Sequence, residues 1–169
     1  MDRLFFERGE LPADFIAGMG DNRARFEELL AAVQATSGHA LSGSAVRNVL
    51  VIAEPWSGDV LYNLPPLLKV AEAAGWEVRI FRRDTYPDLI QPYLKDGLYR
   101  SIPVFVFYDA DFNELAHWTE RPAEATRVID EESLKLRRRL RAEHEAEWRQ
   151  ETLRELFALA NTPAKNEKF

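Results

Sequence analysis

The segment of residues 56–60, WSGDV, carries the side chains best placed to do chemistry. The aliphatic run 49–53 before it predicts a buried strand, and an apolar pattern of helical spacing follows it. Ser57 would therefore lie where a helix begins, and its hydroxyl is either a nucleophile or an N-cap. A nucleophilic serine needs an adjacent base, and no histidine is near position 57 in the sequence. This favours the cap for Ser57, and Asp59 in the first turn would complement the helix dipole.

The composition excludes several kinds of site. The 169-residue chain has no cysteine, so disulfides, thiolate ligands and thiol nucleophiles are absent. Its three histidines are widely spaced, and we expect neither a metal nor a cofactor. A net charge of −6 argues against nucleic acid as a partner. No apolar stretch reaches the ~20 residues that cross a bilayer, and no secretory signal is evident. We therefore expect no membrane association and a cytoplasmic location.

The order of the predicted elements indicates an α/β fold. A helix over about residues 21–35 would begin at the N-cap Asp21, and a small polar linker would follow at 37–44. The helix after the first strand would bend at Pro65 and Pro66 and end at Gly75. A half-exposed strand at 76–80 completes a right-handed parallel strand–helix–strand unit.

The remaining segments predict a second helix, a hairpin and a long final helix. The second helix would cover about residues 86–95, and Gly97 would end it. Strands at 104–108 and 114–118, joined by a tight turn at 109–113, would make the hairpin. The result is a central mixed β-sheet flanked by helices. We divide the chain into an N-terminal extension with a helix (1–44), a core (45–122) and a C-terminal helix and tail (123–169).

The C-terminal segment combines a charged surface with a narrow apolar stripe that recurs every four residues. Its basic run at 135–141, KLRRRLR, is interleaved with acidic residues at helical spacing, which indicates a solvent-exposed face more than a nucleic-acid site. A helix of ~50 Å is too long for a compact domain of this size to flank completely. We therefore expect the stripe to pack on the core, or on a second copy in a homodimer.

Four short segments resemble the thioredoxin superfamily over about residues 45–125. They are AEPWSGDV at 53–60, RRD at 82–84, GLYRSIPV at 97–104 and WTERP at 118–122. Family members carry Trp-Cys-x-x-Cys at the first segment, and a bacterial subgroup carries Trp-Cys-Gly-Asp. The resemblance implies a thioredoxin-like fold in which the attacking cysteine falls on Ser57 and the resolving cysteine on Val60. Neither side chain can form a mixed disulfide, so the chain cannot exchange thiols with its own groups.

The resemblance also implies a binding groove that needs no cysteine. In the superfamily the proline of the third segment is cis, and the backbone beside it pairs with extended peptides or glutathione. We therefore expect a cis bond before Pro103, and a non-catalytic binding or adaptor protein that takes an extended peptide or a small thiol compound near it. The expected binding residues come from both sides of this groove: Trp56, Ser57, Gly58, Asp59, Arg100, Ser101, Ile102 and Pro103.

Other interpretations of these residues stay open. Ser57 could orient the thiolate of glutathione in a cysteine-independent transferase, or it could replace a native cysteine, in which case a thiol–disulfide oxidoreductase would be implied. Trp56 could contact a partner or pack on the helix. The set Arg83, Asp84, Arg100 and Arg121 could form an anion site, but ion pairing within the fold is the commoner arrangement and the one we favour.

Overall fold

The computed structural model describes residues 1–33 and 44–143 of the chain. The predicted linker at 37–44, except its last residue, and the predicted helix beyond 143 lie outside the described residues. The chain divides into two units, Met1–Arg121 and Pro122–Phe169. The N-terminal residues belong to the same unit as the core.

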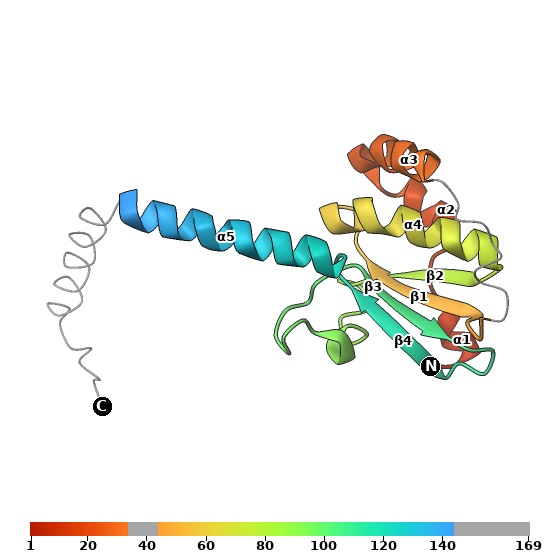
Figure 1. The fold of residues 1–169 in the computed structure, drawn as a ribbon. Helices are drawn as coiled ribbons and strands as arrows, with labels where there is room; N and C mark the ends of the chain where they lie inside the picture. The colour runs from red at the N-terminus through yellow and green to blue at the C-terminus, as the bar shows by residue number, and fades with distance from the viewer. Residues whose placement is uncertain (34–43, 144–169) are drawn as a thin grey trace, which may run out of the picture. The chain divides into compact units, whose positions relative to one another are not determined.

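The first unit is built on a four-stranded mixed sheet with the order β2-β1-β3-β4 (Figure 1). Its strands are β1 (Asn48–Ala53), β2 (Glu77–Arg82), β3 (Val104–Tyr108) and β4 (Glu114–Thr119). The strand β1 pairs parallel with β2 and antiparallel with β3, and β3 pairs antiparallel with β4. This confirms the predicted mixed sheet, the parallel unit and the hairpin.

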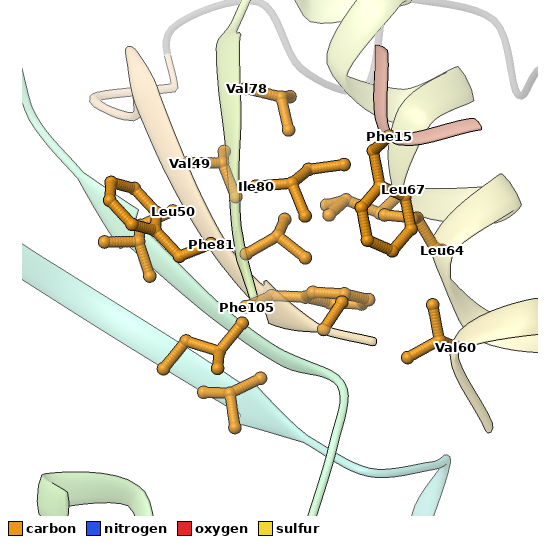
Figure 2. Close-up of a cluster of buried hydrophobic side chains, with 14 of the residues drawn as sticks. Phe15, Val49, Leu50, Val60, Leu64, Leu67, Val78, Ile80, Phe81 and Phe105 are labelled. Carbon is orange, nitrogen blue, oxygen red and sulfur yellow. The ribbon is translucent and has the colours of Figure 1, made fainter. Parts of the chain in front are cut away.

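The interior strand β1 and the helix α4 (Gly58–Ala74) form the centre of the core. All six residues of β1 are buried, as the uninterrupted aliphatic run predicts. Helix α4 lies over one face of the sheet, with α3 (Arg23–Ala32) beside it. Figure 2 shows Leu64 and Leu67 of α4, Ile80 of β2 and Phe15 from the N-terminal region in one buried cluster. Each of these four side chains is less than one tenth exposed.

Helix α4 begins and ends as its sequence predicts. Ser57 is the N-cap, and Gly75 is the C-cap in the left-handed conformation, with φ 69°. The N–H of Trp76 then bonds to the carbonyl of Ala71 at 2.9 Å, which satisfies the last turn. Two prolines, at 65 and 66, lie inside α4 without ending it, and the bend predicted there stays a prediction.

The N-terminal region adds two short helices that the periodicity did not predict, α1 (Arg3–Phe6) and α2 (Pro12–Ala17). One-turn helices are too short to show a helical repeat. Phe5 stacks on Phe81 with 5.4 Å between ring centroids, and Phe6 is completely buried. Between the two helices, Glu10 pairs with Ile80 by two backbone hydrogen bonds of 2.8 and 2.9 Å. The N-terminal region is therefore an integral part of the core.

The helix predicted over residues 86–95 is wrong. The structure has a chain of turns there, followed by the short 3₁₀ helix η3 (Gln91–Tyr93). Pro87 and Pro92 lack the N–H that a helix needs, and each disfavours helical geometry in the residue before it. The segment still packs inward, because Ile90 is completely buried.

The predicted N-cap Asp21 is also wrong. Gly20–Asn22 form a 3₁₀ turn, η1, and α3 begins at Arg23 without a side-chain cap. The side-chain amide of Asn22 instead donates to the carbonyl of Pro55 at 2.9 Å. Asn22, which occupies the N-cap position, therefore uses its side chain for a long-range hydrogen bond and not to cap α3.

The second unit is described only through α5 (Ala123–Glu143). Ion pairs at spacings of three and four residues run along it, such as Arg127 with Glu124 and Glu131. Pairs of this kind are typical of a solvated helix surface and contribute little each. Within the part of the chain that the structure describes, no helix is both long and apolar enough to span a membrane.

We predict that Gly9→Ala destabilises the fold, because Gly9 lies directly against β2. A Cβ at this position would be 2.7 Å from Cε2 of Phe81 and 2.8 Å from Cβ of Arg79. Overpacking of this kind costs about 1–3 kcal/mol, measurable by urea denaturation. Gly58→Ala is the matched control, since nothing lies within 4 Å of its Cβ position. Equal stability of the Gly9 variant and the wild type would contradict the described packing of the N-terminal region.

Candidate functional site

The candidate site lies where β1 ends and β3 begins. These strands are antiparallel neighbours, and Ile52 of β1 pairs with Val104 of β3 at the end of their register. Because the carboxyl end of one antiparallel strand lies beside the amino end of the other, residues 54–57 leave the sheet where residues 100–103 enter it. The two segments that the resemblance assigns to one groove are thus at the same sheet edge.

Ser57 is a helix cap in the structure. Its Oγ accepts a hydrogen bond from the N–H of Val60 at 3.4 Å, and the residue is only 7% exposed. Val60 is completely buried in the core. Among the described residues, this is the only hydrogen bond of the Ser57 side chain, so no base is in contact with it. The geometry therefore gives Ser57 a structural task, as the N-cap of α4.

Trp56 is a large exposed side chain at this edge, with 59% of its surface accessible. The guanidinium of Arg83 lies over its ring, 5.1 Å from the centroid. The same Arg83 donates from Nη1 to the carbonyl of Arg100 at 3.2 Å and pairs with Asp84 at 2.9 Å. Arg83 therefore connects the Trp56 segment with the segment that leads to Pro103.

The segment before β3 has backbone groups without partners. The Ile102–Pro103 peptide bond is cis, and the carbonyl of Pro103 accepts from the N–H of Glu120 at 2.7 Å. By contrast, the backbone N–H and C=O of Ser101 and Ile102 have no hydrogen-bond partner among the described residues. Ile102 is only 6% exposed, and backbone groups of buried residues are nearly always paired. A short stretch of backbone is thus left to bond with something else.

A separate ion-pair network fixes the start of α4 to the end of β4. Asp59 pairs with Arg121 at 2.6 Å, and Arg121 also pairs with Glu120 at 2.8 Å. Lys95 reaches the same Glu120 at 2.6 Å. The side-chain amide of Asn63 donates to the backbone carbonyls of both Asp59 and Glu120. This network holds the α4 side of the site in place.

The four charged residues considered together in the sequence therefore separate into two groups. Arg83 and Asp84 belong to the Trp56 side, whereas Arg121 belongs to the Asp59 network. Arg100 is exposed, and its side chain makes no ion pair within residues 1–33 and 44–143. They do not form a single anion site. The ion-pair arrangement that we favoured for them describes Arg83, Asp84 and Arg121, but not Arg100.

Glu54 is a residue of the site that sequence reasoning missed. It is only 5% exposed, and its Oε1 accepts from the N–H of Asp84 at 2.8 Å. This bond fixes the loop that carries Arg83. The one signal in the sequence was a carboxylate placed directly after a buried strand and before Pro55. Charged side chains are rarely buried without a partner, so such a position indicates a hydrogen-bonded role.

A pocket of about 450 Å³ lies on the Trp56 side of the site. Glu54, Pro55 and Trp56 form one wall, and the others come from residues 18–22 and Arg82. Arg82 makes two hydrogen bonds to Glu10, at 2.6 and 3.1 Å, and these raise the pKa of its guanidinium.

Over the described ranges, no group of three or more side chains could hold a metal ion.

The comparisons with known proteins agree with this geometry. A family model described as thioredoxin matches residues 9–152, so the chain belongs to a thioredoxin family. A crystal structure of a protein of unknown function from Pseudomonas aeruginosa is 21% identical, with a TM-score of 0.62, over 85% of this chain and 90% of that one. An HIV epitope scaffold is 22% identical, with a TM-score of 0.61, over 72% of this chain and 79% of that one. No curated protein matches the chain.

These structural likenesses show the fold. The chain is thioredoxin-like, with no cysteine to perform the exchange that the superfamily's motif performs.

We predict that Ser57→Ala destabilises the protein by about 1 kcal/mol, because α4 loses its N-cap. Ser57→Gly should cost only about a few tenths of a kcal/mol, since glycine is tolerated as an N-cap. Urea denaturation of the two variants measures the difference. If alanine were no worse than glycine, the hydrogen bond from Val60 to Ser57 would not stabilise the helix.

Proposed function

We propose that the chain is a non-catalytic thioredoxin-like binding protein that takes an extended peptide beside Pro103. The observation that supports this most strongly is the unpaired backbone of Ser101 and Ile102 at the sheet edge. An extended ligand can satisfy these groups by strand addition, in which main-chain hydrogen bonds supply affinity without any thiol. A small thiol compound with a peptide backbone, such as glutathione, would fit the same groups.

Trp56 would supply the apolar contact of this site. Trp56 is exposed near the unpaired backbone of Ser101 and Ile102. The guanidinium of Arg83 already contacts one face of its ring. An exposed, oriented tryptophan is a frequent anchor in protein interfaces, because it buries a large surface with few rotatable bonds. The pocket next to Trp56 gives a side chain of the ligand somewhere to lie.

Binding is favoured over catalysis by what surrounds Ser57. A transferase that orients a thiolate with Ser57 needs this hydroxyl to be available to the ligand, whereas it already accepts the Val60 N–H as the N-cap of α4. Thiol–disulfide exchange needs a sulfur, and the sequence has no cysteine. A glutathione-conjugation assay on the wild type and Ser57→Ala separates the transferase from the binding protein.

A titration followed by amide NMR tests the proposal. Extended hexapeptides and glutathione are added to the full-length protein, and we expect shifts at residues 56–60 and 100–104. We predict that Trp56→Ala weakens peptide binding at least tenfold, an energy of about 1.4 kcal/mol. Tyr62→Ala is the matched control, because Tyr62 is an aromatic of equal exposure, 58%, near Arg25 of α3.

Two results would contradict the proposal. One is a titration in which neither ligand moves any signal at 56–60 or 100–104. The other is an equal loss of binding in the Trp56 and Tyr62 variants, which would mean that Trp56 contributes no more than any exposed aromatic.

A further inference from the structure

A narrow apolar face runs along α5. Ile129 and Leu136 are 42% and 47% exposed, and Ala125 and Leu140 continue the face at spacings of about one helical turn. The structure has a groove along this face, lined by Ile129, Glu132, Ser133, Lys135, Leu136 and Arg139. Apolar side chains in a groove with a charged rim are typical of a helix that packs against another helix.

The charges along α5 are segregated around the midpoint of this face. Before it, residues 124–132 contain four acidic side chains and one basic one, Arg127. After it, residues 133–143 contain five basic side chains and one acidic one, Glu143, at the end of the helix. On the rim of the groove, Glu132 precedes the midpoint and Lys135 and Arg139 follow it. Two parallel copies would therefore place like charges together, whereas two antiparallel copies would place opposite charges together.

We propose that two copies of the chain associate through this face, with their α5 helices antiparallel and crossing between residues 134 and 135. In this register Ile129 lies opposite Leu140 of the second copy, and Ser133 lies opposite Leu136. Glu132 then lies between Lys135 and Arg139 of the second copy. Measured along the helix axis, it is about 3 Å from Lys135 and about 3 Å from Arg139. Charge complementarity therefore favours a second copy of the chain as the partner of this face.

The ion pairs within the helix do not compete strongly with this arrangement. Glu132 pairs with Lys135 of its own helix at 2.7 Å and Arg139 with Glu143 at 3.7 Å, but all four side chains are more than half exposed. Exposed pairs of this kind contribute little to stability, so redirecting Glu132 across the interface costs little. Asp130 makes no ion pair among the described residues, which leaves it available to a second copy.

Light scattering coupled to size exclusion measures the association. We expect the full chain to have twice its mass of 19.4 kDa in the micromolar range. The double variant Ile129→Asp/Leu136→Asp should have half the mass of the wild type. The melting temperature of its first unit should be unchanged. Leu134→Asp is the matched control, since Leu134 is 48% exposed on the same helix but lies outside the groove, and this variant should stay dimeric.

Single cysteines test the orientation, because the chain has none to interfere. In the antiparallel pair, two copies of Ser133→Cys lie about 4.5 Å apart along the axis, whereas two copies of Ala125→Cys are about 28 Å apart. A short bis-maleimide should therefore cross-link the first variant and not the second. A monomeric wild type, a double variant that stays dimeric, or cross-linking at position 125 would overturn the proposal.

Discussion

The complete burial of β1 is the constraint on which the rest of the site depends. An interior strand must be covered on both faces and paired on both edges. The strands β2 and β3 pair with the two edges of β1, all of whose residues are buried, and α4 lies over one face of the sheet. Its antiparallel pairing with β3 determines what lies beside its carboxyl end. The polar residues that follow β1 are therefore neighbours of the segment that precedes β3, although nearly fifty residues separate them in the chain.

Ser57 and Val60, which the resemblance aligns with the two cysteines of the superfamily, both have structural tasks at the start of α4. The first N–H groups of a helix need acceptors, and the hydroxyl of Ser57 supplies one to α4. Val60 has an aliphatic side chain that the core buries completely. Both side chains satisfy the fold, and neither can take part in thiol exchange. We propose that the groups that recognise a ligand are the backbone before Pro103 and the indole of Trp56.

Long-range polar contacts maintain the shape of this edge. The carboxylate of Glu54 accepts a hydrogen bond from the backbone N–H of Asp84. The neighbouring Arg83 then lies between the ring of Trp56 and the carbonyl of Arg100. On the opposite side, Arg121 ties Asp59 to the end of β4. The unpaired backbone of Ser101 and Ile102 lies between these two anchored regions, so a ligand that bonds there meets a surface that is already ordered.

The sequence predicts those elements whose own residues determine their structure. The aliphatic run of β1, the apolar repeat and Gly75 of α4, and the turn of the hairpin are local signals, and the structure confirms them.

The failures have two causes. Pro87 and Pro92 lie within residues 86–95 and outweigh the helical pattern there, a local effect. Asn22 instead donates to the distant Pro55, in the site's own loop. The one-turn helix at Arg3–Phe6 depends on packing, for example of Phe5 on Phe81, which no local repeat reveals. In the site, the resemblance predicts which segments meet, whereas the burial of Glu54 and the bridge made by Arg83 depend on the tertiary structure.

The central claim is that this chain recognises a ligand through backbone hydrogen bonds beside Pro103 and without sulfur. The most direct test compares the affinity of an extended hexapeptide with that of the same peptide N-methylated at one amide after another, measured by calorimetry. Our account predicts that methylation of the amide that pairs with the Ser101–Ile102 segment lowers affinity about tenfold or more, because one hydrogen bond is lost and a backbone acceptor is left unpaired. Equal affinity of all the methylated peptides would contradict it.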